Sequence, residues 1–228
     1  MAVFTVTQLR IGKAVPFGPQ GQVSAIDKQP QAGVLWLGRL GFAGDEQGDP
    51  CHHGGPDKAV HAYSAAHYPL WAADLPQVAA HFRPGGFGEN LVIEGADETS
   101  ICMGDQWQLG AAILEVSQAR QPCWKLNLRF ALPDMARRVQ ASGRTGWYFR
   151  VLREGQVSPG TARLLSRPYP DWSLARVLRL LYRDTQDFAA LSDFAALSGL
   201  PESWRKLAEA RLRNRQIEDW RSRLDTPV

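Results

Sequence analysis

A change of sequence character near residue 167 constrains the fold of this chain more than any other feature. Residues 1 to 166 of the 228-residue chain carry short apolar–polar alternations broken by glycine and proline, which is typical of many short strands joined by turns. After the segment Arg167-Pro-Tyr-Pro-Asp171, apolar residues recur at helical spacing. The sequence therefore predicts a strand-rich domain over 1–167 and a helical domain over 168–228.

Nine segments of the first domain have the alternation expected of strands. They are 3–11, 23–26, 34–40, 60–63, 90–93, 107–109, 112–118, 147–152 and 162–165. So many short strands predict a β-barrel or a strongly curved sheet. The segments 147–153 and 156–157 are interpreted as a hairpin. Two inserted helices are expected, 65–82 with a break at Pro76, and 133–142 with Pro133 at its first position and Gly143 after its end.

The second domain is predicted to be a small all-α bundle of three helices, so that the fold class is mainly β followed by an all-α tail. Ser173 can cap the first helix. A tandem hexapeptide over 187–198 is interpreted as a second helix that Gly199 ends. Pro201 is expected to open a last helix that continues to Leu224. Between Arg205 and Arg223 there are seven cations and three anions, read either as a solvated face or as a docking surface for an acidic partner.

The composition excludes several classes of function. A net charge of +3 is too small to indicate a nucleic-acid-binding protein. The chain has no leader pattern and no apolar run long enough for a membrane span, and its three cysteines do not make a disulfide framework. We therefore expect a reduced, cytoplasmic chain. The absence of Walker A, Gly-x-Gly-x-x-Gly and Gly-x-Ser-x-Gly patterns argues against ATP, dinucleotide and serine-hydrolase chemistry.

Cys123 is the first candidate for chemistry. It follows a predicted strand, and Arg120 and Lys125 lie within three residues of it. Nearby cations favour the thiolate, which is the form that attacks electrophiles or binds a metal. Pro122 fixes the backbone just before the sulfur. Cys102, between Ile101 and Met103, is expected in the core instead.

Two glycine-containing turns are candidates for ligand binding. Gly54 and Gly55, with Lys58, predict an anion cradle, and a simple tight turn before the strand at 60 is an equal alternative. The histidines and cysteine around this turn lack the regular spacing of a zinc site. The second turn, over 84–91, contains Asn90, whose amide offers both donors and an acceptor to the edge of a heterocycle.

Four motifs, taken in order, resemble those of MOSC domains, which are related to the carboxy-terminal part of molybdenum-cofactor sulfurases. The motifs are His53-Gly-Gly-Pro-Asp-Lys-Ala-Val60, Phe87-Gly-Glu-Asn-Leu91, Met103-Gly-Asp105 and Arg120-Gln-Pro-Cys-Trp-Lys125. The helical tail matches the YiiM-type subgroup, so the resemblance covers nearly the whole chain. It implies a β-barrel-like fold, a molybdenum cofactor and a cysteine that ligates molybdenum, here Cys123.

The resemblance also implies roles for the other candidates. His53, Lys58 and Arg120 would hold the cofactor phosphate, with Gly54, Gly55 and Lys125 beside them, and Asn90 and Ser117 would hydrogen-bond the pterin. Many relatives have arginine where this chain has Lys58, which keeps the charge but not the bidentate geometry. Trp124 is expected in the core, with a place in the substrate pocket as the alternative.

The function implied is reduction of N-hydroxylated small molecules, such as hydroxylaminopurine base analogues, by a molybdenum-cofactor enzyme. The alternative is a sulfur-carrier or cofactor-binding module with a persulfide on Cys123. Because the chain has no flavin or nicotinamide signature, a separate reductase, expected to be a flavoprotein, must supply electrons. We expect that donor to dock on Lys206, Arg211, Arg213 and Arg215. The sequence leaves the oligomeric state open, with a homodimer among the alternatives.

Overall fold

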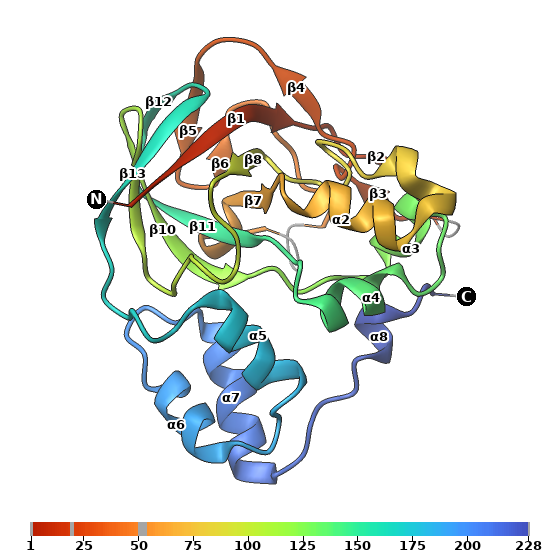
Figure 1. Cartoon of the computed structure of the whole chain (residues 1–228), viewed down its shortest axis with the longest axis vertical. Helices are drawn as coiled ribbons and strands as arrows, with labels where there is room; N and C mark the ends of the chain where they lie inside the picture. Colours follow the sequence, from red (N-terminus) through yellow and green to blue (C-terminus); the bar gives the residue numbers. More distant parts are fainter. Residues whose placement is uncertain (1, 19–20, 50–53, 228) are drawn as a thin grey trace.

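Seven strands of the chain close into a barrel (Figure 1). The computed structural model describes residues 2–18, 21–49 and 54–227. The strands follow each other around the barrel in the order β13 (Gly160–Ser166), β9 (Gln106–Leu109), β10 (Ala112–Ala119), β11 (Trp147–Arg153), β7 (Val60–Ser64), β8 (Leu91–Glu94) and β1 (Val3–Ile11). The barrel closes because β1 also pairs with β13, and β4 (Gln29–Gln31) extends it at the far end of β1. The predicted barrel is confirmed.

Alternation along the strands fills the barrel with large apolar side chains. Phe4 and Val6 on β1 are buried, while Val3 is exposed, as expected for a strand with one face in the core. Phe4 packs against Trp107 with ring centroids 4.4 Å apart. Strand β10 departs from the alternation, because its last four residues are all buried. Polar residues at that end of β10 therefore lie in the protein interior.

Two smaller sheets lie outside the barrel, and one of them corrects the predicted hairpin. Strand β12 (Gly155–Val157) pairs with β5 (Leu35–Gly38), which in turn pairs with β6 (Gly41–Phe42). The predicted hairpin is wrong, because β12 pairs with β5 and not with β11, whose partners are β10 and β7. The second small sheet consists of β2 (Val15–Pro16) and β3 (Val23–Ser24).

The inserted helices surround an aromatic cluster beside the barrel. The predicted helix over 65–82 is broken at Pro76 as expected, into α2 (His67–Asp74) and the 3-10 helix η2 (Pro76–His81). The helix predicted to begin at Pro133 begins later, as α4 (Met135–Ser142), because Asp134 is the capping residue and has a non-helical backbone. A further helix, α3 (Lys125–Phe130), was not predicted; it is only six residues long.

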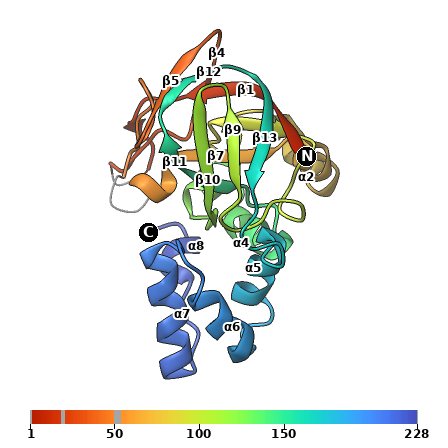
Figure 2. The same ribbon diagram turned by 90° about the vertical axis from the view of Figure 1, so that its left-hand side faces the viewer.

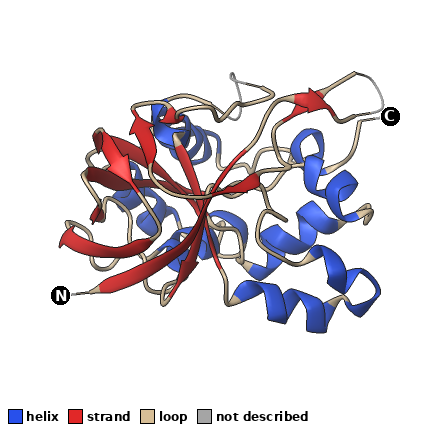
Figure 3. Ribbon diagram, turned by 90° about the horizontal axis from the view of Figure 1, so that it is seen from above, coloured by secondary structure: helices blue, strands red, loops and turns tan. Residues whose placement is uncertain are grey.

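The helical tail lies beside one end of the barrel (Figures 1 and 2). It contains α5 (Leu174–Tyr182), α6 (Phe188–Ala195), α7 (Glu202–Asn214) and α8 (Arg221–Leu224). Ser173 caps α5 as predicted, since its side chain accepts a hydrogen bond from the Arg176 amide. Apolar residues of α5, α6 and α7 belong to the same buried cluster as the barrel interior. Viewed from above, along the long axis of Figure 1, strands gather on the side of the N-terminus and helices lie behind and beside them (Figure 3).

The predicted last helix, 201–224, is wrong in its extent. Helix α7 ends at Asn214, because Arg215 has a left-handed backbone with φ of 56°. The chain then runs back toward the barrel without regular structure until α8. We call residues 215–225 the C-terminal arm. Its return to the barrel brings residues from the end of the chain close to Cys123.

The predicted docking face is also corrected, because Arg211 is buried. Its guanidinium is 2.7 Å from a Glu218 carboxylate oxygen and donates to the Leu181 carbonyl oxygen at 2.8 Å. A side chain with 3% exposure cannot meet a protein partner. Arg211 instead holds the arm to α5 and α7.

Replacement of Arg211 by alanine should therefore destabilise the fold. The change removes the donor of the Leu181 carbonyl and two of the hydrogen bonds to the Glu218 carboxylate, which we expect to lower the free energy of unfolding by about 2 kcal/mol. The matched control is Arg213→Ala, two residues away and exposed, with an expected effect within about 0.5 kcal/mol. Equal effects in urea denaturation would contradict the assignment.

Candidate functional site

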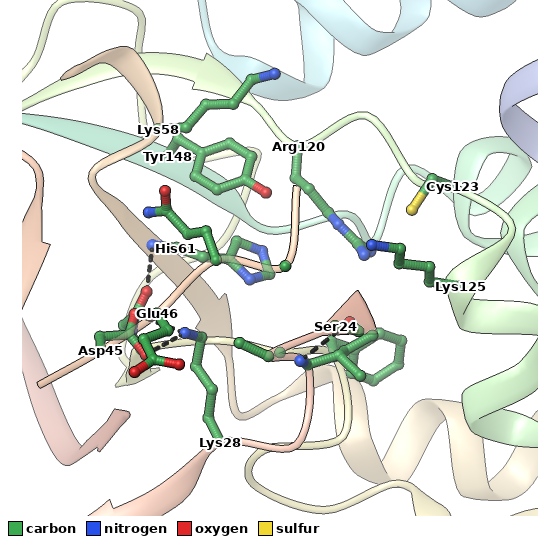
Figure 4. Close-up of a pocket in the computed structure, with 17 residues that line it drawn as sticks. Ser24, Lys28, Asp45, Glu46, Lys58, His61, Arg120, Cys123, Lys125 and Tyr148 are labelled. Atoms are coloured by element: carbon green, nitrogen blue, oxygen red, sulfur yellow. Dashed lines mark hydrogen bonds and ion pairs between the residues drawn. The ribbon is translucent and has the colours of Figure 1, made fainter. Parts of the chain in front are cut away.

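A basic pocket opens beside Cys123 at the end of strand β10 (Figure 4). The segment between β10 and α3 contributes Arg120 and Cys123, and the 3-10 helix η1 (Pro56–Lys58) contributes Lys58. Adjacent positions on β7 and β11 contribute His61 and Tyr148, which pair across the two strands. The cavity here measures about 80 Å³. A second cavity of about 410 Å³ adjoins it and shares Lys58, Cys123 and Tyr148.

Cationic side chains dominate the lining of the basic pocket. In Figure 4, Arg120 and Lys125 extend toward the middle of the pocket and Cys123 lies beside them. Arg120 and Lys125 are 6% and 7% exposed, and the Lys125 ammonium donates to the Val23 carbonyl oxygen at 2.9 Å. Burial lowers the pKa of Lys58, although Cys123, Asp49 and Asp57 oppose that change. The flanking cations predicted for Cys123 thus line one pocket with it.

A buried ion pair forms the floor of the pocket. The Lys28 ammonium lies 2.5 and 2.6 Å from the two carboxylate oxygens of Asp45. Burial lowers the pKa of Lys28, and Asp45 counteracts this effect. The Asn90 amide donates to the same carboxylate and to the Arg10 carbonyl oxygen, and accepts from the His61 backbone amide. This network fixes β7 relative to the floor.

His61 and Tyr148 are uncharged groups inside a cationic site. Burial, aided by the charge of Arg120, lowers the pKa of His61 to about 3, so its imidazole is neutral near pH 7. Burial raises the pKa of Tyr148, while Arg120 opposes the change. The two rings are 5.1 Å apart between centroids. Tyr148 therefore keeps its proton and can donate a hydrogen bond into either cavity.

Two buried nitrogen atoms of the pocket have no hydrogen-bond partner among the described residues. They are Nη1 of Arg120 and Nε2 of His61. Buried polar groups are nearly always paired, and exceptions mark places where a ligand or water belongs. Oxygen atoms of an anionic cofactor would satisfy the Arg120 donor in a charge-assisted hydrogen bond. The side chains present therefore fit a phosphate-bearing cofactor next to the sulfur.

The other predicted cofactor residues lie elsewhere or serve the protein itself. His53 lies outside the described residues. Gly54 and Gly55 are not among the described residues that line the cavities, and the φ of 93° at Gly55 is what a tight turn requires. The Ser117 hydroxyl lies 2.5 Å from the Asp57 carbonyl oxygen, so it anchors η1 next to Lys58. Both amide hydrogens of Asn90 are used within the protein, which leaves none for a pterin.

Sequence patterns did not identify several residues that line the two cavities. Lys28 and Asp45 lie in loops and Tyr148 lies on β11, so contacts across the fold bring them to the site, and nothing in their local sequence distinguishes them. Ser222 and Arg223 come from the C-terminal arm and line the larger cavity. Trp124 also lines it and is half-buried, so its alternative place in the pocket wall is the one found.

Arg223 ties the arm to the segment that carries Cys123. Its guanidinium donates to the Pro122 carbonyl oxygen at 2.5 Å and to the Gln140 side-chain oxygen at 2.6 Å. The Trp124 amide donates to the Arg223 carbonyl oxygen at 2.8 Å. The backbone on both sides of the sulfur is thus held from the end of the chain.

The chain thus combines a closed β-barrel, a buried cysteine in a cation-lined pocket and a small helical domain beside the barrel. Residues 49–162 match the MOSC domain family, and residues 172–215 match the YiiM-like 3-alpha helix domain. The chain belongs to the MOSC-domain family, with the YiiM-like helical domain. The resemblance drawn from the four motifs is confirmed.

Individual proteins agree with this family. The chain is 40% identical over 205 residues to YflK of Bacillus subtilis, covering 89% of this chain and 91% of that one. It is 36% identical over 206 residues to YiiM of Escherichia coli, covering 90% and 92%. The crystal structure of that YiiM superposes with a TM-score of 0.83 at 31% identity, covering 97% and 98%.

One relative, from a fungus, has a name that refers to an enzyme activity. A protein from Gibberella moniliformis named "Reductase" is 37% identical to this chain over 210 residues. The match covers 91% of this chain but only 37% of the fungal protein, which is much longer.

Among the described residues, no helix has the length and apolar character that a membrane span requires.

Replacement of His61 by glutamine should make the protein less sensitive to acid. Between pH 6.5 and about 3 the unfolded chain binds a proton at this histidine that the folded protein does not. The contribution of His61 to the free energy of unfolding is therefore fully present above pH 6.5. It decreases by about 1.4 kcal/mol per pH unit as the pH falls below that value.

Urea unfolding of both proteins between about pH 4 and 7 measures the effect, which appears as a flatter pH dependence in the variant. His81→Gln is the control, because His81 is exposed. Parallel curves for wild type and His61→Gln would show that His61 does not titrate differently on folding.

Proposed function

We propose that this protein is a molybdenum-cofactor-dependent reductase of N-hydroxylated small molecules, with Cys123 as the protein ligand of molybdenum. The observation that carries the proposal is the buried, cation-lined pocket around Cys123 in a MOSC-family barrel, with unpaired polar atoms on Arg120 and His61. The fungal relative named "Reductase" supports the reaction class. A thiolate is a soft ligand suited to such a metal centre.

Each described residue of the pocket has a defined task in this proposal. Arg120 and Lys125, with Lys58, would neutralise the anionic cofactor, and Arg120 would bind its phosphate oxygen atoms by charge-assisted hydrogen bonds. The Lys28–Asp45 pair and Asn90 would keep the pocket floor rigid. Ser117 would hold η1 so that Lys58 faces the sulfur.

The reaction removes the hydroxyl oxygen of the substrate as water. One hydroxylamine, two electrons and two protons give one amine and one water molecule. The bound cofactor supplies the two-electron, oxygen-removing chemistry, and the protein supplies binding, orientation and electrostatics. Tyr148 lines both cavities and keeps its proton because burial raises its pKa. Its hydroxyl group would donate a hydrogen bond to the substrate oxygen.

The cysteine ligand is tested by substitution. Protein purified from a host that makes the cofactor should contain molybdenum and reduce an N-hydroxylated purine when supplied with an artificial electron donor. Cys123→Ala should lower kcat/KM more than about 100-fold, because loss of a metal ligand exceeds the effect of losing a supporting residue. Cys102→Ala is the control, since Cys102 is also buried but contacts Pro170 instead of the pocket.

Two results would overturn the proposal. Wild-type protein without molybdenum from a competent host, inactive after reconstitution, would exclude the cofactor. An intact mass with one additional sulfur atom on Cys123, again without bound cofactor, would favour a sulfur carrier instead.

The electron donor would dock on the exposed basic part of the tail. With Arg211 buried, the remaining candidates of that face are Lys206, Arg213 and Arg215, all exposed. Lys206 is paired with Glu202 at 2.6 Å, and Arg215 stacks on Phe188. Arg213 is therefore the best single site for a test.

Charge reversal at Arg213 should weaken binding of an acidic flavoprotein donor. Surface charges act mainly on association, so Arg213→Glu should raise the apparent KM for the donor several-fold at low salt and much less at high salt. Turnover with a small artificial donor should not change. Identical donor kinetics in wild type and variant at low salt would remove this face from consideration.

A further inference from the structure

We infer that the cavity of about 410 Å³ between β10 and the C-terminal arm is the substrate compartment, and that Gln118 contacts the substrate there. The inference rests on the proposed function, because it requires a substrate that reacts beside Cys123. It assigns to substrate a cavity distinct from the basic pocket that would take the cofactor phosphate.

The lining of this cavity differs chemically from that of the basic pocket. Its described lining residues are mainly neutral and polar or aromatic, namely Gln118, Gln121, Trp124, Tyr148 and Ser222, with Cys123, Arg223, Asp49 and Lys58 completing it. The Asp49 carboxylate offsets one of the two cations of the lining, Lys58 and Arg223. The Arg223 guanidinium is committed to Pro122 and Gln140. The cavity is therefore suited to an uncharged ligand.

Gln118 provides the independent observation that points to a ligand. It is only 2% exposed, and its side-chain oxygen has no hydrogen-bond partner among the described residues. A buried acceptor without a partner destabilises the fold, and a leucine of similar size would avoid that cost. The cavity beside Gln118 is where a ligand N–H group can supply the missing bond.

Neighbouring side chains define the class of substrate. The Gln121 amide nitrogen donates to the Tyr182 hydroxyl at 3.2 Å, which leaves its carbonyl oxygen for a second ligand donor. Trp124 is half-buried in the same wall and offers a face for stacking. Two amide acceptors and one aromatic face describe a site for a planar, neutral nitrogen heterocycle that carries N–H donors.

Residues of both the barrel and the C-terminal arm line this compartment. Ser222 and Arg223 line this cavity together with Gln118 of β10. Arg223 holds the Cys123 segment, because its guanidinium donates to the Pro122 carbonyl oxygen and its own carbonyl oxygen accepts from the Trp124 amide. The helical tail thus takes part in substrate binding through its last residues.

Adenine, a neutral planar amine of the kind the reaction would release, is a suitable probe for the cofactor-loaded protein. We expect Gln118→Leu to weaken adenine binding about tenfold, the effect of one lost hydrogen bond, as measured by isothermal titration calorimetry. Molybdenum content should stay at the wild-type level. The melting temperature should not fall, because the variant removes an unpaired buried acceptor. If Gln118 only stabilised the fold, Gln118→Leu would lower the melting temperature.

The control is Gln108→Leu, because Gln108 lies on the neighbouring strand β9 and bonds to the Gly110 carbonyl oxygen outside the cavity. Gln118→Met provides a second removal of the acceptor should Gln118→Leu fold poorly. Unchanged adenine affinity in both Gln118 variants, or no adenine binding to wild type, would overturn the inference. Wild type that binds adenine through Gln118 but reduces no N-hydroxylated compound would instead reject the proposed function and leave the compartment in place.

Discussion

The double pairing of strand β11 is the constraint on which the site depends. Because β11 bonds to β10 and to β7 at once, three segments far apart in the sequence end next to each other. Tyr148 lies opposite His61, and Trp147 lies opposite Ala119, the residue before Arg120. The assembly of the site is thus a consequence of one arrangement of hydrogen bonds.

Burial then determines the chemistry of the groups that this pairing assembles. The neutral state of His61 follows from its burial beside the charge of Arg120, and the protonated state of Tyr148 follows from its burial. Lys28 retains its partner Asp45 in the pocket floor. The pocket that contains Cys123 also contains the charges of Arg120, Lys58 and Lys125 and the uncharged side chains of His61 and Tyr148. In the proposed function, the basic pocket would take the anionic cofactor and the adjoining cavity the neutral substrate.

Local sequence patterns predicted the barrel, the break at Pro76, the Ser173 cap and Cys123 as the centre of the site. These features depend on alternation, turn chemistry and neighbouring charges, which are visible within a few residues. The hairpin, the extent of the last helix and the role of Arg211 depend on contacts across the fold. No residue near Arg215 indicates that this position has a left-handed backbone and ends α7. The spacing of the arginines on that helix likewise does not predict which of them pairs with Glu218. Lys28 and Tyr148 were missed for the same reason.

The C-terminal arm changes how the two parts of the chain are related. A tail that only covered the end of the barrel could be exchanged without consequence for chemistry, but this one shares a buried core with the barrel and closes the cavity next to Cys123. Arg223 contacts the backbone on either side of the sulfur and the side chain of Gln140 on α4. A change in the packing of α5 and α7 would therefore reach the arm through Arg211 and the sulfur through Arg223. These contacts make the helical tail part of the support of the site.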